Sequence, residues 1–228
     1  MKLSELFEKL PEIPIKNDIR YFLSFNPIIP ESISNLSPIK GYEQMYQLKE
    51  GDVVVDAGAY PGDYAIWASR QVGATGKVIC FEPTPHNRAI LERNLRREKY
   101  DNAIIVPKGL WNKNTTLNLS GITGFSASVS EDNTGDTIDV SRLDDALDKL
   151  GISKIDVLKM DIEGAEIEAI QGCEKTLEAN KAQVMIATYH IVNGQNTSSF
   201  IEGVLKKYGY EAQTTYPTHL TTHGWRND

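Results

Sequence analysis

The sequence predicts an α/β fold built on a mostly parallel, doubly wound sheet. From Gly51 onward, short apolar runs rich in β-branched residues alternate with segments of helical periodicity. This alternation is typical of right-handed βαβ units, with helices on both faces of a sheet. Runs such as VVV at 53–55 and VMIA at 184–187 are apolar without interruption, which indicates strands buried on both sides.

The expected elements follow from the periodicity and from the turn residues between them. Thr84 and Ser141 are predicted to cap helices, and Gly209 to follow the last one. The stretch 110–140 is less regular, and its alternation predicts a hairpin or a loop. Strands are expected at 52–58, 77–83, 103–109, 154–161, 183–190, 210–216 and 219–225, and helices at 64–73, 85–99, 141–151, 166–180 and 198–209.

Residues 1–48 differ from the rest of the chain in composition and in the pattern of apolar residues. A short amphipathic pattern leads into a stretch rich in Pro and Ser, which argues for loops and turns. We therefore expect two parts: an N-terminal cap at 1–48 on the substrate side, and a main domain at 49–228.

Composition excludes several classes of protein. With 24 basic and 31 acidic residues the net charge is −7, which disfavours a broad nucleic-acid surface. No apolar run approaches the roughly 20 residues of a membrane span, and the acidic N-terminus does not resemble a signal peptide. Cys80 and Cys173 form neither a disulfide framework nor a zinc motif. We expect a cytoplasmic protein with reduced thiols.

The loop after the first strand, DAGAYPGDY at 56–64, has glycines where a nucleotide-binding loop would have them. Tyr60 stands where a dinucleotide fingerprint needs its second glycine, which disfavours NAD and FAD. A loop with Gly58 and Gly62 can still accept a smaller anion, such as a carboxylate, at a helix N-terminus. A plain strand-to-helix turn is the alternative.

Glu82 ends the second strand, where a carboxylate can accept hydrogen bonds from both ribose hydroxyls. The alternative is a surface acid near a helix start. A glycine loop for a carboxylate together with a ribose-binding acid suits S-adenosylmethionine. Acidic residues at strand ends would favour its sulfonium and ammonium groups.

Four segments in this order, VVVDAGAYPGDYAI, VICFEPTPHNRAILERNL, LDDAL and IDVLKMDIEGAEIEAIQG, resemble the FkbM-type methyltransferase family. The resemblance covers roughly 51–190. It implies a class I methyltransferase (Rossmann-like) fold with seven strands ordered 3-2-1-4-5-7-6, S-adenosylmethionine as cofactor, and O-methylation. The cofactor-binding residues that it implies are Asp56, Gly58, Ala59, Tyr60, Gly62, Glu82, Pro83, Asn87, Gly109, Leu110 and Asp161.

The segment DVLKMDIEGAE at 156–166 crowds four acids together. Alternation along the strand places Asp161 at its carboxyl end, and Glu163 follows in the turn. Asp156 starts the strand at the opposite edge, and Glu166 is expected in the first helical turn. We expect the latter two to stay solvated, and Asp161 and Glu163 to face the site.

His190, at the end of the fifth strand, is the candidate general base, with Asp161 beside it to orient the imidazole. Asp161, Glu163 and His190 are thus the predicted catalytic group. Three alternatives stay open: His190 only ends a strand, it positions a carboxylate acceptor that needs no base, or the three residues bind a divalent cation. The metal-free interpretation is preferred. His219 and His223 are expected at the surface or rim.

These observations predict an S-adenosylmethionine-dependent O-methyltransferase. Its acceptor would be a hydroxyl, or a carboxylate, on a saccharide or small natural product. A non-catalytic module that binds S-adenosylmethionine and a metal-assisted O-methyltransferase are the alternatives. An NAD-type oxidoreductase is disfavoured by Tyr60.

Overall fold

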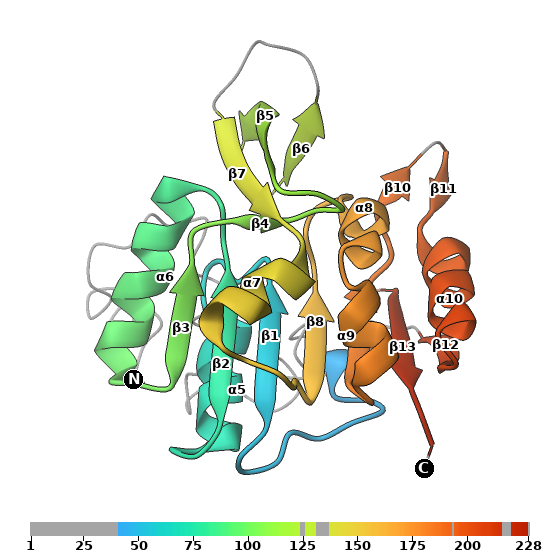
Figure 1. Cartoon of the computed structure of the whole chain (residues 1–228). Helices are drawn as coiled ribbons and strands as arrows, with labels where there is room; N and C mark the ends of the chain where they lie inside the picture. The colour runs from blue at the N-terminus through green and yellow to red at the C-terminus, as the bar shows by residue number, and fades with distance from the viewer. Residues whose placement is uncertain (1–40, 124–125, 131–136, 193, 216–219, 228) are drawn as a thin grey trace, which may run out of the picture.

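The computed structural model describes residues 41–123, 126–130, 137–192, 194–215 and 220–227. Its main sheet has seven strands in the order β12-β13-β9-β8-β1-β2-β3, seen in Figure 1. Only β13 runs against its neighbours. This is the predicted class I order. The bounds are β1 Val53–Ala57, β2 Lys77–Phe81, β3 Ala103–Val106, β8 Val157–Met160, β9 Gln183–Ala187, β12 Glu211–Thr215 and β13 Thr221–Trp225.

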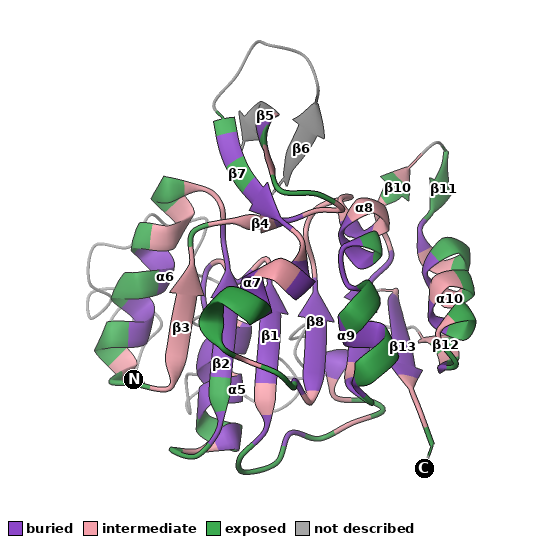
Figure 2. Cartoon of the chain, in the orientation of Figure 1, coloured by how far each residue is buried: buried purple, intermediate pink, exposed green. Residues whose placement is uncertain are grey.

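The central strands are buried along almost their whole length (Figure 2). Val55 on β1 pairs in register with Ile79 on β2 and with Leu158 on β8. The uninterrupted apolar runs in the sequence therefore mark a sheet covered on both faces.

Two sets of helices cover the two faces. Side chains of α5 and α6 pack with Val54, Val78 and Cys80. Side chains of α7, α8, α9 and α10 pack with Val55, Ile79 and other residues on the opposite face. The bounds are α5 Asp63–Val72, α6 Pro85–Glu98, α7 Leu143–Leu150, α8 Glu166–Gln171, α9 Glu174–Ala179 and α10 Ser198–Lys207.

Helix boundaries confirm two of the three predicted terminal residues. Thr84 occupies the N-cap of α6, although its side chain makes no capping hydrogen bond. Gly209 follows Tyr208, the C-cap residue of α10, and has φ 77°. Ser141, however, ends a strand, and Arg142 is the N-cap residue of α7.

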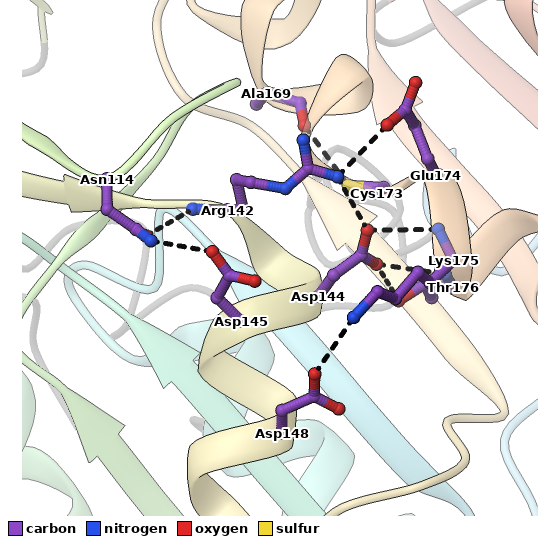
Figure 3. A network of polar contacts seen from close by, with 10 residues as sticks. All are labelled: Asn114, Arg142, Asp144, Asp145, Asp148, Ala169, Cys173, Glu174, Lys175 and Thr176. Atoms are coloured by element: carbon purple, nitrogen blue, oxygen red, sulfur yellow. Dashed lines mark hydrogen bonds and ion pairs between the residues drawn. The ribbon is translucent and has the colours of Figure 1, made fainter.

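The single helix expected at 166–180 is wrong, because the chain breaks between α8 and α9. A Cβ on Gly172 would lie 2.1 Å from the carbonyl oxygen of Trp111, so the backbones approach very closely there. Asp144 on α7 then accepts hydrogen bonds from the backbone amides of Lys175 and Thr176, each at 3.0 Å. Figure 3 shows this carboxylate, which caps α9 from a neighbouring helix.

Within 110–140, the described residues confirm the predicted hairpin, because β5 and β6 pair antiparallel. These strands belong to a second sheet of four strands in the order β4-β7-β5-β6, which rises beyond the carboxyl ends of the main strands (Figure 1). Its core pairing joins Gly109 to Val140 across a long stretch of sequence. The bounds are β4 Gly109–Leu110, β5 Thr115–Thr123, β6 Ser126–Ser130 and β7 Thr137–Ser141.

A short hairpin of β10 Ile191–Val192 and β11 Gln195–Asn196 also lies at this end (Figure 1). His223 is not a surface residue as expected: it is buried in β13, with Nε2 3.1 Å from Thr215 Oγ1. The His219 prediction falls outside the described residues.

Residues 1–40 of the predicted cap lie outside the described residues. Its last part is described, and there Tyr42 and Leu48 join the core on the α5 and α6 face. Among the helices that the structure describes, we find none with the length and apolar character to traverse a bilayer.

Candidate active site

The predicted cofactor loop connects β1 to α5 and is wedged between β2 and β8. The backbone amides of Gly58 and Ala59 donate to the carbonyl of Phe81, and the Asp161 amide donates to the carbonyl of Ala57 at 3.0 Å. The carboxyl ends of three adjacent strands are thereby tied together. Ala59 is buried, Tyr60 is half-buried, and Gly62 is the N-cap residue of α5 with φ 105°.

Gly58 is required by its surroundings as well as by its backbone. A Cβ at this position would lie 1.9 Å from the carbonyl oxygen of Asp161, and φ is 75°. No other residue type fits such contact without moving the backbone. The loop and the end of β8 are therefore directly packed, which places Asp161 beside the cofactor loop.

Asp56 pairs with a residue that the sequence interpretation did not include. Its Oδ1 lies 2.8 Å from Lys159 Nζ, and the two side chains are 0% and 5% exposed. Lys159 Nζ also donates to the carbonyl oxygen of Gly58 at 3.2 Å. Asp56 therefore supports the loop through Lys159.

The charges of this pair can be assigned. Burial raises the pKa of Asp56 to about 6, a rise that Lys159 opposes. Burial alone would lower the pKa of Lys159, but Asp56 and Asp161 outweigh it and raise that pKa. Both groups are thus charged at neutral pH. Rings of Tyr42 and Tyr64, each centred 5.6 Å from Nζ, add cation–π contacts.

Glu82, just beyond β2, is 5% exposed. Its Oε1 accepts from the Thr84 amide at 3.0 Å and from Asn87 Nδ2 at 3.4 Å. Burial raises the pKa of its carboxyl, and these donors oppose the rise. Asn87 therefore lies where it positions the carboxylate.

Pro83 and Gly109 are neighbours at the same edge. A Cβ on Gly109 would lie 3.5 Å from Pro83 Cγ, and Leu110 beside it is buried. The structure thus gathers the predicted ribose and adenine residues around the ends of β2 and β3.

Asp161 is held by two tyrosines that the sequence interpretation missed. Tyr42 donates to Oδ2 and Tyr189 to Oδ1, both at 3.0 Å. Tyr42 comes from the end of the predicted N-terminal cap, so that segment reaches the site. Tyr189 precedes His190, and its position beside the candidate base was the only signal in the sequence.

His190 lies among three carboxylates. Its Nδ1 is 3.0 Å from Glu166 Oε1, while Nε2 is 3.3 Å from Glu163 Oε2 and 3.9 Å from Asp161 Oδ1. The structure confirms that Asp161, Glu163 and His190 come together. The nearest carboxylate to the imidazole, however, is Glu166.

The prediction that Glu166 stays solvated is wrong. Its side chain is 0% exposed, and Oε1 accepts from the Ile162 and Gly164 amides at 3.0 and 3.3 Å. The acid closes the turn between β8 and α8 as well as facing His190. Asp156 remains partly exposed at the far end of β8, where it pairs with Lys154.

Burial alone would lower the pKa of His190, but Glu163, Glu166 and Asp161 raise it to about 10. The imidazole therefore holds a proton at neutral pH in this state. A base must be unprotonated near the working pH, so the carboxylates have made the imidazole more basic than the predicted role requires.

A sequence model of the methyltransferase FkbM domain matches residues 56–212, which is more than half of the chain. The chain belongs to the FkbM methyltransferase family. Two curated relatives agree with this assignment. Methyltransferase sdnD of Sordaria araneosa is 25% identical over 199 residues, covering 72% of this chain and 75% of the relative. Methyltransferase 1 of Beauveria bassiana is 24% identical over 145 residues, covering 53% and 58%.

Solved structures share the fold of this FkbM domain. Methyltransferase FkbM from Methylobacillus flagellatus superposes with a TM-score of 0.61 at 17% identity, covering 90% of this chain and 58% of that one. Fibrillarin from Aeropyrum pernix, solved with natively bound S-adenosyl-L-methionine, superposes with a TM-score of 0.57 at 14% identity, covering 83% of this chain and 74% of fibrillarin. Precorrin-6y C5,15-methyltransferase from Geobacter metallireducens superposes with a TM-score of 0.56 at 14% identity, covering 92% of this chain and 96% of that enzyme. The fold is therefore that of class I methyltransferases.

The cofactor of this FkbM domain is S-adenosylmethionine, and the residues present fit it. Thr84 and Asn87 already orient the Glu82 carboxylate, which would accept hydrogen bonds from the ribose hydroxyls. The Asp161 backbone packs against the loop at Gly58, so its carboxylate stands near that loop, where it would favour the sulfonium cation.

Proposed function

We propose that this FkbM methyltransferase is an O-methyltransferase acting on a hydroxyl of a saccharide or small natural product. The observation that carries the proposal is the group Asp161, Glu163 and His190, whose ligand atoms converge at the carboxyl ends of β8 and β9. Asp161 of this group packs its backbone against the cofactor loop at Gly58. Ligands of open α/β sheets bind at these strand ends.

An oxygen acceptor is favoured by the chemistry of the group. S-Adenosylmethionine supplies an electrophilic methyl group, so the protein mainly has to align the acceptor with it. An alcohol must also lose a proton, which needs a proton acceptor within reach. Asp161 and Glu163 are carboxylates at this position, and Glu163 is the more exposed, at 31% of its side chain.

His190 has a different role from the predicted base in this proposal. As an imidazolium it offsets the negative charge of the carboxylates and can donate to the acceptor oxygen. Asp161, fixed by Tyr42 and Tyr189, orients the acceptor. A carboxylate acceptor remains the second target class, because it would need alignment without proton removal. A cytoplasmic location also stays a prediction.

The test is methyl transfer from labelled S-adenosylmethionine to a panel of saccharides and hydroxylated small molecules. NMR of the product locates the methyl group. We expect it on oxygen, with the rate reduced at least tenfold in Glu163→Gln and unchanged in the exposed control Glu178→Gln. A methyl group on nitrogen or carbon would refute O-methylation.

The alternative, a non-catalytic module that binds S-adenosylmethionine, predicts a different result in the same assays. Such a module would bind S-adenosylhomocysteine in calorimetry and yet transfer no methyl group to any acceptor in the panel, with Glu163→Gln indistinguishable from the parent protein.

A further inference from the structure

We propose that Asp161, Glu163 and Nε2 of His190 bind a divalent cation, with Glu166 as the positioning residue behind the imidazole. The role of the cation in methyl transfer rests on the proposed function, whereas the site itself is argued from geometry alone. The three ligand atoms all lie within 4.8 Å of one another. They stand at the strand ends, beside the cofactor loop.

The spacing suits a cation. A metal that holds its ligands at about 2.0–2.2 Å, at angles of roughly 90–110°, separates adjacent ligand atoms by about 2.8–3.6 Å. His190 Nε2 lies 3.3 Å from Glu163 Oε2 and 3.9 Å from Asp161 Oδ1. Small side-chain movements therefore bring all three atoms to coordination distance.

Two of the three proposed ligands, His190 and Asp161, have an outer partner of the kind found at metal centres. Glu166 Oε1 lies 3.0 Å from His190 Nδ1 and is fixed by two backbone amides. With Nδ1 facing this carboxylate, Nε2 is the atom turned toward Asp161 and Glu163. Asp161 accepts from two tyrosine hydroxyls and still has lone pairs for a cation.

A simple ion-pair cluster explains the arrangement less well. Both nitrogens of His190 are buried, and neither makes a hydrogen bond of ordinary geometry to a described residue, although carboxylates lie close by. Glu166 Oε2 is also buried and lacks a hydrogen-bond partner within the described part of the chain. A cation on Nε2 would displace the proton that the imidazole carries in the metal-free state, fix the ring and satisfy the excess of acceptors around it.

The cation would act on the acceptor. Three protein ligands leave coordination positions for a substrate oxygen, and a bound cation lowers the pKa of a coordinated hydroxyl. Because Asp161 and Glu163 are then ligands of the cation, the O–H bond breaks with the proton passing to solvent and not to either carboxylate. A C–O bond forms as the S–C bond breaks, and the electron pair of that bond stays on sulfur as a neutral thioether. Open adjacent positions suit an acceptor with neighbouring hydroxyls.

Binding of Mn²⁺ to the chelator-treated full chain, measured by calorimetry and electron paramagnetic resonance, tests the site. We expect one Mn²⁺ per chain, and affinity reduced at least tenfold in His190→Gln and Glu163→Gln. Glu166→Gln should reduce affinity about 10- to 100-fold, because it removes the outer partner of the imidazole. The exposed Glu178→Gln is the matched control and should bind Mn²⁺ as the parent does.

S-Adenosylhomocysteine binding, measured on the same samples, separates this inference from the proposed function. Retained binding in Glu163→Gln and Glu166→Gln shows that these variants are folded, so that their loss of Mn²⁺ supports the site. Equal Mn²⁺ affinity in the parent and all three site variants, or full methyl transfer after chelation, would overturn the inference and leave O-methylation standing. Mn²⁺ binding without methyl transfer would contradict the proposed function alone.

Discussion

Lys159 Nζ lies 2.8 Å from Asp56 Oδ1, and this buried ion pair joins β8 to β1 directly beneath the cofactor loop. Lys159 is one of the few charged side chains in the described core, at 4% exposure. Burying two charges costs desolvation, so the pair is weak evidence for stability by itself. Its contact with the Gly58 carbonyl indicates that it shapes the loop.

Replacing Lys159 with Met should destabilise the fold by about 3–5 kcal/mol, because Asp56 is left buried without its partner. Urea unfolding measures this. The control is Lys154→Met, whose ammonium pairs with Asp156 while 70% exposed, and which should change stability by roughly 0–1 kcal/mol. Equal effects of the two substitutions on the free energy of unfolding would contradict the conclusion that Lys159 is the required partner of the buried Asp56. Asp56→Leu combined with Lys159→Met should recover part of the loss.

Asp56 should titrate well above an ordinary aspartate. Its pKa is about 6 in the folded protein against 3.8 for the free group. Between these values the folded state keeps a proton that the unfolded state has released. The contribution of Asp56 to the unfolding free energy is thus full below about pH 4 and is lost as pH rises to about 6. Carboxyl ¹³C NMR, with the resonance assigned by Asp56→Asn, checks this; a midpoint below 4 would contradict it.

Gly58→Ala should abolish most cofactor binding. The new Cβ would stand 1.9 Å from the Asp161 carbonyl oxygen, so loop and strand must separate. We expect at least a tenfold loss of S-adenosylhomocysteine affinity by calorimetry. Gly203→Ala on α10, where a Cβ meets no atom within 4 Å, is the control and should bind normally while gaining about 0.5–1 kcal/mol of stability. Normal binding by Gly58→Ala would show that the close packing is not needed.

Glu82→Gln should weaken S-adenosylhomocysteine binding by about 1.5–3 kcal/mol, or roughly 10- to 150-fold, because a charged acceptor for the ribose hydroxyls becomes a neutral amide. Glu92→Gln provides the control, since Glu92 pairs with Arg96 on the exposed face of α6. Similar affinities for both variants would place the ribose elsewhere.

The strands and the cofactor side could be predicted because their signals are local, whereas the order of the strands in the sheet was implied by the resemblance to the FkbM family. Apolar runs mark buried strands, and Gly58, Glu82 and Asp161 each follow directly after one. Their positions at the carboxyl ends then follow from the parallel arrangement.

The features of the fold that were not predicted depend on contacts between segments that are distant in the sequence. The break between α8 and α9 is set by Trp111 and Asp144, neither of which lies in the helical segment. Pairing of Gly109 with Val140 builds the second sheet across thirty intervening residues. Neither contact can be predicted from the periodicity of the sequence, because each joins segments that are far apart in the chain.

The site residues that were missed have the same explanation. Glu166 was assigned by its helix position, but the fold turns it inward against His190. Tyr42 comes from a segment without a recognisable pattern. Lys159 carried a usable signal, since alternation places it on the face of Asp161 and a lysine inside a buried run needs a partner.

The most direct test of the account is a crystal structure of the full chain with S-adenosylhomocysteine. We expect the ribose hydroxyls within hydrogen-bond distance of Glu82, and the sulfur facing Asp161, Glu163 and His190. A product molecule bound with its ribose away from Glu82, or with its sulfur directed away from those three residues, would contradict the account.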